Sequence, residues 1–175
     1  MVISAQGHRT ASWTARALLL VSVVAIGAAG WWIVSGEPER AGASLLAAAC
    51  ALVIATSLRG RSQRDLLLPS FVDRLFDGVA LATIAWASRT SDPATAAGAL
   101  IALCASFLAA YMRVRGASLG YSLEESVATR VIRYALVCVG LIAGWLELTV
   151  WMLAALAALA AVVRASQVAK EERAL

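Results

Sequence analysis

Six long runs of apolar residues constrain this chain more than any other feature of its sequence. They cover residues 16–35, 41–58, 71–88, 94–112, 130–146 and 148–167. A helix needs about 20 mostly apolar residues to cross the hydrocarbon core of a bilayer, and each run approaches that length once some tilt is allowed. The composition agrees, because 61% of the residues are hydrophobic and only 15% are charged. We therefore predict an all-α integral membrane protein, folded as a bundle of six transmembrane helices.

The chain of 175 residues has little room for anything besides these spans. We expect a cytosolic N-terminal segment at residues 1–15, a six-helix membrane domain at 16–168 and a cytosolic tail at 169–175. No soluble second domain is expected.

The cations are distributed unevenly between the two sets of connections that alternate along the chain. One set holds only Arg40 and Arg89. The other set, which includes both termini, holds thirteen cations: Arg9, Arg16, Arg59, Arg61, Arg64, Arg74, Arg113, Arg115, Arg130, Arg133, Arg164, Lys170 and Arg173. Because cationic connections stay in the cytosol, the sequence predicts an N-in/C-in orientation. Five of the six tryptophans are then expected near the opposite interface: Trp31, Trp32, Trp86, Trp145 and Trp151.

Three charged residues, Asp73, Arg74 and Asp77, stand at the start of the third apolar run. Ionisable groups at membrane depth are costly and are usually explained by a partner, a water-filled cavity or a function. Asp73 and Asp77 are four residues apart, so they share one helix face, where their charges repel unless a cation lies between them. That cation is either a divalent metal ion or an arginine, from position 74 or from a neighbouring helix. The spacing leaves both interpretations open.

Other common catalytic patterns are missing from the sequence. His8 is the lone histidine, which excludes a histidine-based metal site or catalytic triad, and no glycine-rich phosphate loop is visible. Nucleic acid is not expected as a partner.

Two regions resemble a family of membrane enzymes. Residues 53–61 (VIATSLRGR) and 69–78 (PSFVDRLFDG) resemble the signature of the CDP-alcohol phosphatidyltransferases. That signature reads D-x-x-D-G-x-x-A-R, a spacer, and G-x-x-x-D-x-x-x-D, across the second and third helices of a six-helix bundle. Residues 105–120, with 124–125 and 130–133, are similar to the segment S-Y-x-K-A-R-A-E-A-x-G and the following E-R-x-x-R of the actinobacterial phosphatidylinositol-phosphate synthase branch. The resemblance covers residues from about 41 to 145.

The resemblance implies four aspartates that hold two divalent ions against the donor pyrophosphate, but the first half of the signature is eroded. With Arg61 as the signature arginine, Val53 and Thr56 stand at the first two aspartate positions. In one register, Asp73 and Asp77 are the third and fourth aspartates. In the other, Asp73 is the fourth and Asp77 is an additional aspartate of the branch. At least two of the four metal-binding aspartates are therefore missing.

Site residues follow from the resemblance. It implies that Asp73 and Asp77 bind Mg²⁺ or Mn²⁺ and form the catalytic pair, with one of them as the base, while Arg61 contacts the donor phosphate. Four further arginines would contact the acceptor phosphate or anionic lipid headgroups: Arg113, Arg115, Arg130 and Arg133. Arginines beside membrane spans also serve topology and bind headgroups in most membrane proteins, and the sequence leaves this simpler role open.

The function implied is a step of phospholipid biosynthesis at the cell membrane, on the cytosolic face. A phosphatidyl or alcohol-phosphate group would pass from a CDP-linked lipid donor to a small alcohol or alcohol phosphate, with release of CMP. The eroded signature equally suits a catalytically inactive paralogue that acts as a lipid-binding or assembly partner. Since members of this family often dimerise, the resemblance also implies a homodimer, although the sequence identifies no dimer face.

Overall fold

The computed structural model describes residues 2–58, 63–120 and 127–172, with side chains described within 13–58, 67–120 and 128–167. The described residues form six α-helices: α1 (Val2–Val34), α2 (Pro38–Ser57), α3 (Gln63–Ser88), α4 (Pro93–Ser118), α5 (Val127–Ala143) and α6 (Leu146–Glu172). The prediction of an all-α bundle is confirmed.

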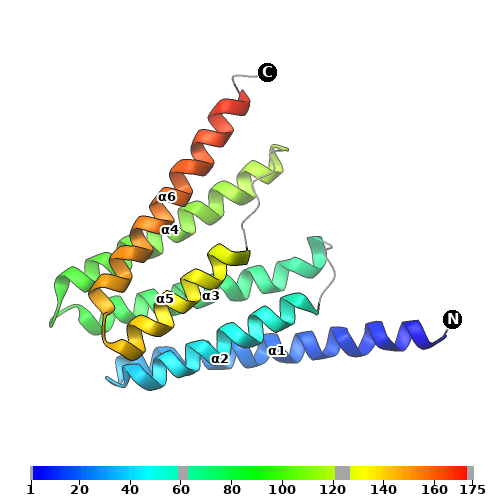
Figure 1. Cartoon of the computed structure of the whole chain (residues 1–175), viewed down its shortest axis with the longest axis horizontal. Coiled ribbons are helices and arrows are strands. Elements are labelled where there is room, and N and C mark those ends of the chain that lie inside the picture. Colours follow the sequence, from blue (N-terminus) through cyan, green and yellow to red (C-terminus); the bar gives the residue numbers. More distant parts are fainter. Residues whose placement is uncertain (1, 59–62, 121–126, 173–175) are drawn as a thin grey trace.

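The helices run back and forth between two ends of the bundle (Figure 1). One end, here called the turn end, carries the short connections 35–37, 89–92 and 144–145. The other end, here called the terminal end, carries the start of α1 and the end of α6. Figure 1 shows that the helices gather at the turn end and fan apart at the terminal end. The chain therefore begins and finishes on the same side of the bundle.

Helices α3 and α5 occupy the middle of the bundle. Helix α1 packs against α2 and α3, α2 packs against α5, and α4 packs against both α3 and α6. Figure 1 accordingly shows α1 and α2 on one side, α4 and α6 on the other, and α3 and α5 between these pairs.

Four of the helices are long and apolar enough to cross a membrane: Trp13–Val34 within α1, α2, α4 and Leu146–Gln167 within α6. The two central helices do not meet this measure. Helix α5 has only 17 residues, and α3 carries Asp73, Arg74 and Asp77 inside its apolar stretch. The protein is thus a membrane-embedded helical bundle, whereas the count of six spans and the orientation stay predictions.

Helix bounds extend beyond the apolar runs at several places. Helix α1 begins at Val2, α3 begins at Gln63 rather than at residue 71, and α6 continues to Glu172. Pro69, which precedes the apolar run 71–88, consequently lies inside α3. Hydropathy detects only the apolar part of a helix. Polar turns that extend the same helix beyond its apolar part are therefore not predicted from hydropathy.

The outer surface of the bundle is rich in large apolar side chains, which suits contact with lipid. Exposed examples occur on most helices: Leu20, Val24, Leu46, Phe71, Leu108, Val139 and Leu159. Patches of this extent are rare on proteins that are surrounded by water. Trp31, Trp86 and Trp145 are exposed near the turn end, where amphipathic indole rings are favoured at a membrane interface.

Small residues allow the closest helix contacts near the turn end. A Cβ atom added to Gly140 of α5 would lie 2.1 Å from Oγ1 of Thr149 on α6. A Cβ atom added to Gly42 of α2 would lie 2.6 Å from Cγ1 of Ile142 on α5. Glycine at these positions lets the helix backbones approach each other, as in many membrane bundles.

Substituting Gly140 with alanine is expected to lower the free energy of unfolding by about 1–3 kcal/mol, because the new methyl group forces α5 and α6 apart. Gly27→Ala is the matched control, since no atom lies within 4 Å of a Cβ at that position. Thermal unfolding of both variants in detergent measures the difference. Equal melting temperatures would contradict the close approach of α5 and α6.

Candidate functional site

Two buried carboxylates lie side by side on α3. Asp73 and Asp77 are one helical turn apart, and both are buried among α3, α4 and α5. The side chain of Asp73 is only 1% exposed. A buried carboxylate is stable only when cations and hydrogen-bond donors surround it, so the neighbours of the pair define the site.

Arg133 reaches from α5 to both carboxylates. Its Nη1 donates to Asp77 Oδ2 at 2.9 Å, and its Nη2 donates to Asp73 Oδ1 at 3.1 Å. One guanidinium group therefore bridges the two acids through the two arms of its fork. Such charge-assisted hydrogen bonds are about twice as strong as neutral ones.

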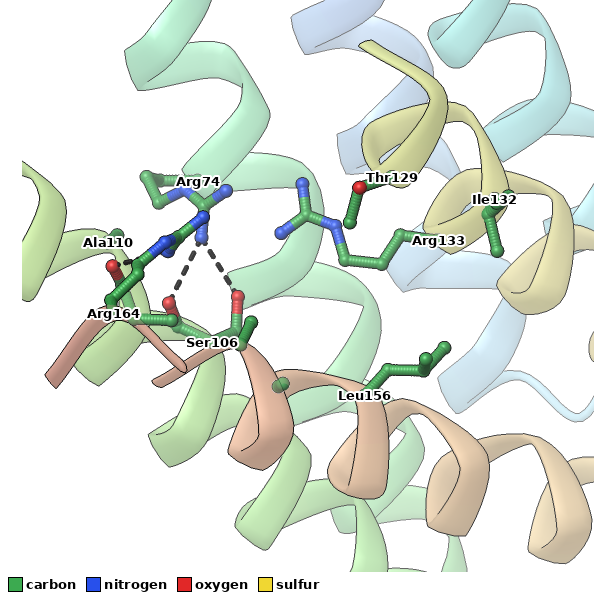
Figure 2. A pocket seen from close by; sticks show the side chains of 11 residues that line it. Arg74, Ser106, Ala110, Thr129, Ile132, Arg133, Leu156 and Arg164 are labelled. Carbon is green, nitrogen blue, oxygen red and sulfur yellow. Dashed lines mark hydrogen bonds between the residues drawn. The ribbon is translucent and has the colours of Figure 1, made fainter. Parts of the chain in front are cut away.

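Arg74 forms a second bridge from α3 itself. Its Nη1 lies 3.2 Å from Asp77 Oδ2, and its Nη2 donates to Asp73 Oδ2. Nη1 also donates to the side-chain oxygen of Ser106 on α4 at 2.9 Å, as Figure 2 shows. Ser106 in turn donates to Asp77 Oδ2 at 2.6 Å. These bonds tie α3 to α4.

Arg130 and Tyr134 complete the surroundings of Asp73. Tyr134 donates its hydroxyl hydrogen to Asp73 Oδ1, and Nε of Arg130 lies 3.7 Å from the same oxygen. Both residues belong to α5, and the ring of Tyr134 packs on Phe76 of α3 with 4.4 Å between the ring centroids.

We call Asp73, Arg74, Asp77, Arg130 and Arg133 the ion-pair cluster. Its three guanidinium groups outnumber its two carboxylates, which leaves one positive charge in excess.

A cavity of about 150 Å³ opens beside the ion-pair cluster, between α3, α4, α5 and α6. Figure 2 shows the side chains of Arg74, Arg133 and Arg164 around this space. Arg164 belongs to α6, and its Nη1 donates to the backbone oxygen of Ala109 at 2.6 Å. The rest of the lining is Ser106, Thr129 and apolar residues: Ala109, Ala110, Ile132, Leu156, Ala157 and Ala160. Among the described lining residues there is no aspartate or glutamate.

The structure brings some of the predicted site residues together and separates others. Arg130 and Arg133 join Asp73 and Asp77 in the ion-pair cluster. Arg113 and Arg115 lie further along α4 toward the terminal end, and neither belongs to the described lining of the cavity. Arg61 lies outside the described residues.

Sequence reasoning did not select three residues of this site: Ser106, Tyr134 and Arg164. Tyr134 directly follows Arg133, and this position beside a predicted site residue was a signal available in the sequence. Ser106 and Arg164 gave no such signal. Serines are common in membrane helices, and a single arginine near a helix end usually marks topology.

The donor set of the site does not fit a divalent ion. Mg²⁺ requires oxygen ligands in near-octahedral geometry, yet both oxygens of Asp73 and one oxygen of Asp77 already accept from arginine. Within the described part of the chain, no group of three or more histidine, cysteine, aspartate or glutamate side chains is placed to hold a metal ion. Binding of Mg²⁺ or Mn²⁺ by Asp73 and Asp77 stays a prediction that these contacts do not favour.

Comparison with known proteins adds no assignment: no family model matches the chain, and no curated protein matches its sequence. The resemblance to CDP-alcohol phosphatidyltransferases therefore rests on the motifs in residues 53–78 and 105–133.

Proposed function

We propose that all six helices cross the cell membrane, with the terminal end in the cytosol. Helices α3 and α5 lie between the two outer pairs and connect the same two ends of the bundle, which supports a transmembrane course for both. Asp73, Arg74 and Asp77 of α3 are paired within the ion-pair cluster, so they face the bundle interior rather than lipid, as intramembrane charges do. The excess of arginine and lysine at the terminal end supports the orientation.

We further propose that the cavity binds the phosphate group of an anionic lipid. The observation that carries this proposal is the lining itself: three arginines from three helices surround a space without any acidic residue among the described lining. Guanidinium groups bind phosphate through paired hydrogen bonds, and they do so most strongly where water is excluded. At about 150 Å³ the space suits a headgroup phosphate rather than a whole lipid. The apolar residues Ile132 and Leu156 beside it suit the hydrocarbon of that lipid.

On this proposal the protein is a CDP-alcohol phosphatidyltransferase-like bundle that works as a lipid-binding or assembly partner. Two features support binding over metal-dependent transfer. Val53 and Thr56 stand where the resemblance requires carboxylates, and the remaining acids are engaged by Arg74 and Arg133. Neither acid belongs to the described lining of the cavity.

Lipid retention tests this proposal. Purified protein would be transferred from nanodiscs of phosphatidylcholine with a minor share of phosphatidic acid or CDP-diacylglycerol into mild detergent, and retained lipid counted by native mass spectrometry. We expect retention of the anionic lipid. Arg164→Gln should weaken that retention by about tenfold to a hundredfold, because a lost hydrogen bond between charged groups is worth about 1.5–3 kcal/mol. Arg115→Gln is the matched control, since Arg115 is exposed and lies outside the described lining.

Two outcomes distinguish the alternatives. Displacement of the lipid by inorganic phosphate at low concentration would identify free phosphate as the ligand. Equal retention of phosphatidylcholine and the anionic lipids, or equal behaviour of Arg164→Gln and Arg115→Gln, would contradict the proposed site.

The second candidate is transfer of a phosphatidyl or alcohol-phosphate group from a CDP-linked donor to a small alcohol or alcohol phosphate. Burial of Asp73 and Asp77 beside arginines favours it, because burial of unneeded charges is costly. Metal-dependent release of CMP from CDP-diacylglycerol in nanodiscs, lost on Asp73→Asn, would support this candidate. A bona fide enzyme of the family, assayed in parallel, is the positive control.

A further inference from the structure

The ion-pair cluster contains a closed ring of charges. Arg133 contacts Asp77 and Asp73 at 2.9 and 3.1 Å. Arg74 contacts the same two residues, with 3.2 Å between its Nη1 and Asp77 Oδ2. Each guanidinium group thus bridges both carboxylates, and each carboxylate contacts both guanidinium groups. We call these four residues the charge ring.

We propose that Arg74 and Arg133 act as resident cations that replace a divalent ion between Asp73 and Asp77. Two guanidinium groups carry the same total charge as one divalent ion, so the ring neutralises the two acids without a metal. The inference rests on the contacts of the acidic pair alone and is independent of whether the cavity binds a lipid.

The geometry explains why arginine suits this role. A guanidinium group is planar and always charged, and the two arms of its fork match carboxylate oxygens at the spacing seen here. Its charge belongs to the chain, so it cannot dissociate when the ion concentration falls. Tyr134 donates a further hydrogen bond to Asp73, and Ser106 donates one to Asp77.

A divalent ion added to the intact ring would meet strong repulsion. Three guanidinium groups contact the acids, with Arg130 as the third at 3.7 Å from Asp73. Like charges repel far more strongly in a protein interior than in water, because the effective dielectric constant is lower. Removal of both ring arginines would leave the two carboxylates exposed to each other, with a free position between them.

Binding of Mn²⁺ tests the charge ring in nanodiscs made of neutral lipid, with free Mn²⁺ followed by electron paramagnetic resonance. We expect wild-type protein to bind no more Mn²⁺ than Asp73→Asn/Asp77→Asn, and its melting temperature to be unchanged by Mn²⁺ or by EDTA. Arg74→Gln/Arg133→Gln is expected to gain one saturable Mn²⁺ site and to melt at a higher temperature when Mn²⁺ is present. Arg74→Gln/Arg133→Gln combined with Asp77→Asn should lose that gain.

Saturable Mn²⁺ binding by wild-type protein that disappears in Asp73→Asn/Asp77→Asn would overturn the inference. This comparison does not require Arg74→Gln/Arg133→Gln to fold. A folded Arg74→Gln/Arg133→Gln that neither binds Mn²⁺ nor is stabilised by it would overturn the inference as well. The lipid-retention assay on the same wild-type sample reports separately on the cavity, so the two proposals fail independently.

Discussion

Replacing Arg133 by methionine is expected to lower the free energy of unfolding by about 3–5 kcal/mol, the usual cost of removing one partner from a buried ion pair. Methionine keeps much of the length and apolar volume of the side chain but removes the three hydrogen bonds to the two acids. Asp73 then keeps Arg74, Arg130 and Tyr134, whereas Asp77 keeps only Arg74 and Ser106 among its described contacts. Chemical unfolding in mixed micelles, followed by tryptophan fluorescence, would measure the loss.

Arg115→Met is the matched control for this experiment. Arg115 is exposed on α4, and surface substitutions usually change stability by less than about 0.5 kcal/mol. Arg133→Lys should fall between wild type and Arg133→Met, because an ammonium group supplies the charge without the fork that spans two acids. If Arg133→Met were as stable as Arg115→Met, the bridge between α5 and α3 would have no energetic role.

Replacing Asp73 by asparagine is expected to have an effect of similar size, again about 3–5 kcal/mol. The substitution preserves shape but removes the negative charge that Arg74, Arg130 and Arg133 share. The ion-pair cluster would then hold three guanidinium groups and one acid, Asp77, which contacts Arg74 and Arg133. The same unfolding measurement applies.

A double-mutant cycle tests whether Asp73 and Arg133 stabilise the protein through their contact with each other. Asp73→Asn and Arg133→Met remove partners of the same ion pair, so the double variant should lose less stability than the two single losses combined, by about 0.5–3 kcal/mol. Simple additivity would mean that Asp73 and Arg133 do not interact in the membrane. Pairing Asp73→Asn with Gly140→Ala, in a different part of the bundle, supplies an additive control.

The sequence was sufficient to predict the helices and the central acidic pair. Apolar runs located all six helices because each helix that faces lipid must be apolar over most of its length. Asp73 and Asp77 stood out because charges inside such runs are rare. The sequence also allowed an arginine to neutralise the two acids. In the structure, Arg74 and Arg133 form ion pairs with them.

Contacts between helices were beyond sequence reasoning. The spacing of Asp73 and Asp77 fixes one helix face, but the rotation of α5 about its own axis decides whether Arg130, Arg133 or both reach that face. Arg164 could be recognised only once α6 was known to border the cavity. The linear resemblance grouped Arg113 and Arg115 with Arg130 and Arg133, but only the last two contact the acidic pair among the described ion pairs. A role of Arg113 and Arg115 in binding phosphate stays a prediction.

The charge ring has a consequence for how the protein is made. Arg133 stands 60 residues after Asp73 in the chain, so α3 leaves the ribosome well before its second cation is synthesised. During that interval Arg74 is the one cation of the charge ring that is already available to Asp73 and Asp77. An apolar segment with three charges is a poor substrate for lateral release into lipid. We therefore expect α3 to stay near the insertion machinery until α5 arrives, which makes membrane integration of the central helices a coupled step. In chains truncated before residue 127, a cysteine introduced into α3 should stay open to a water-soluble maleimide, while longer chains that include α5 should protect it.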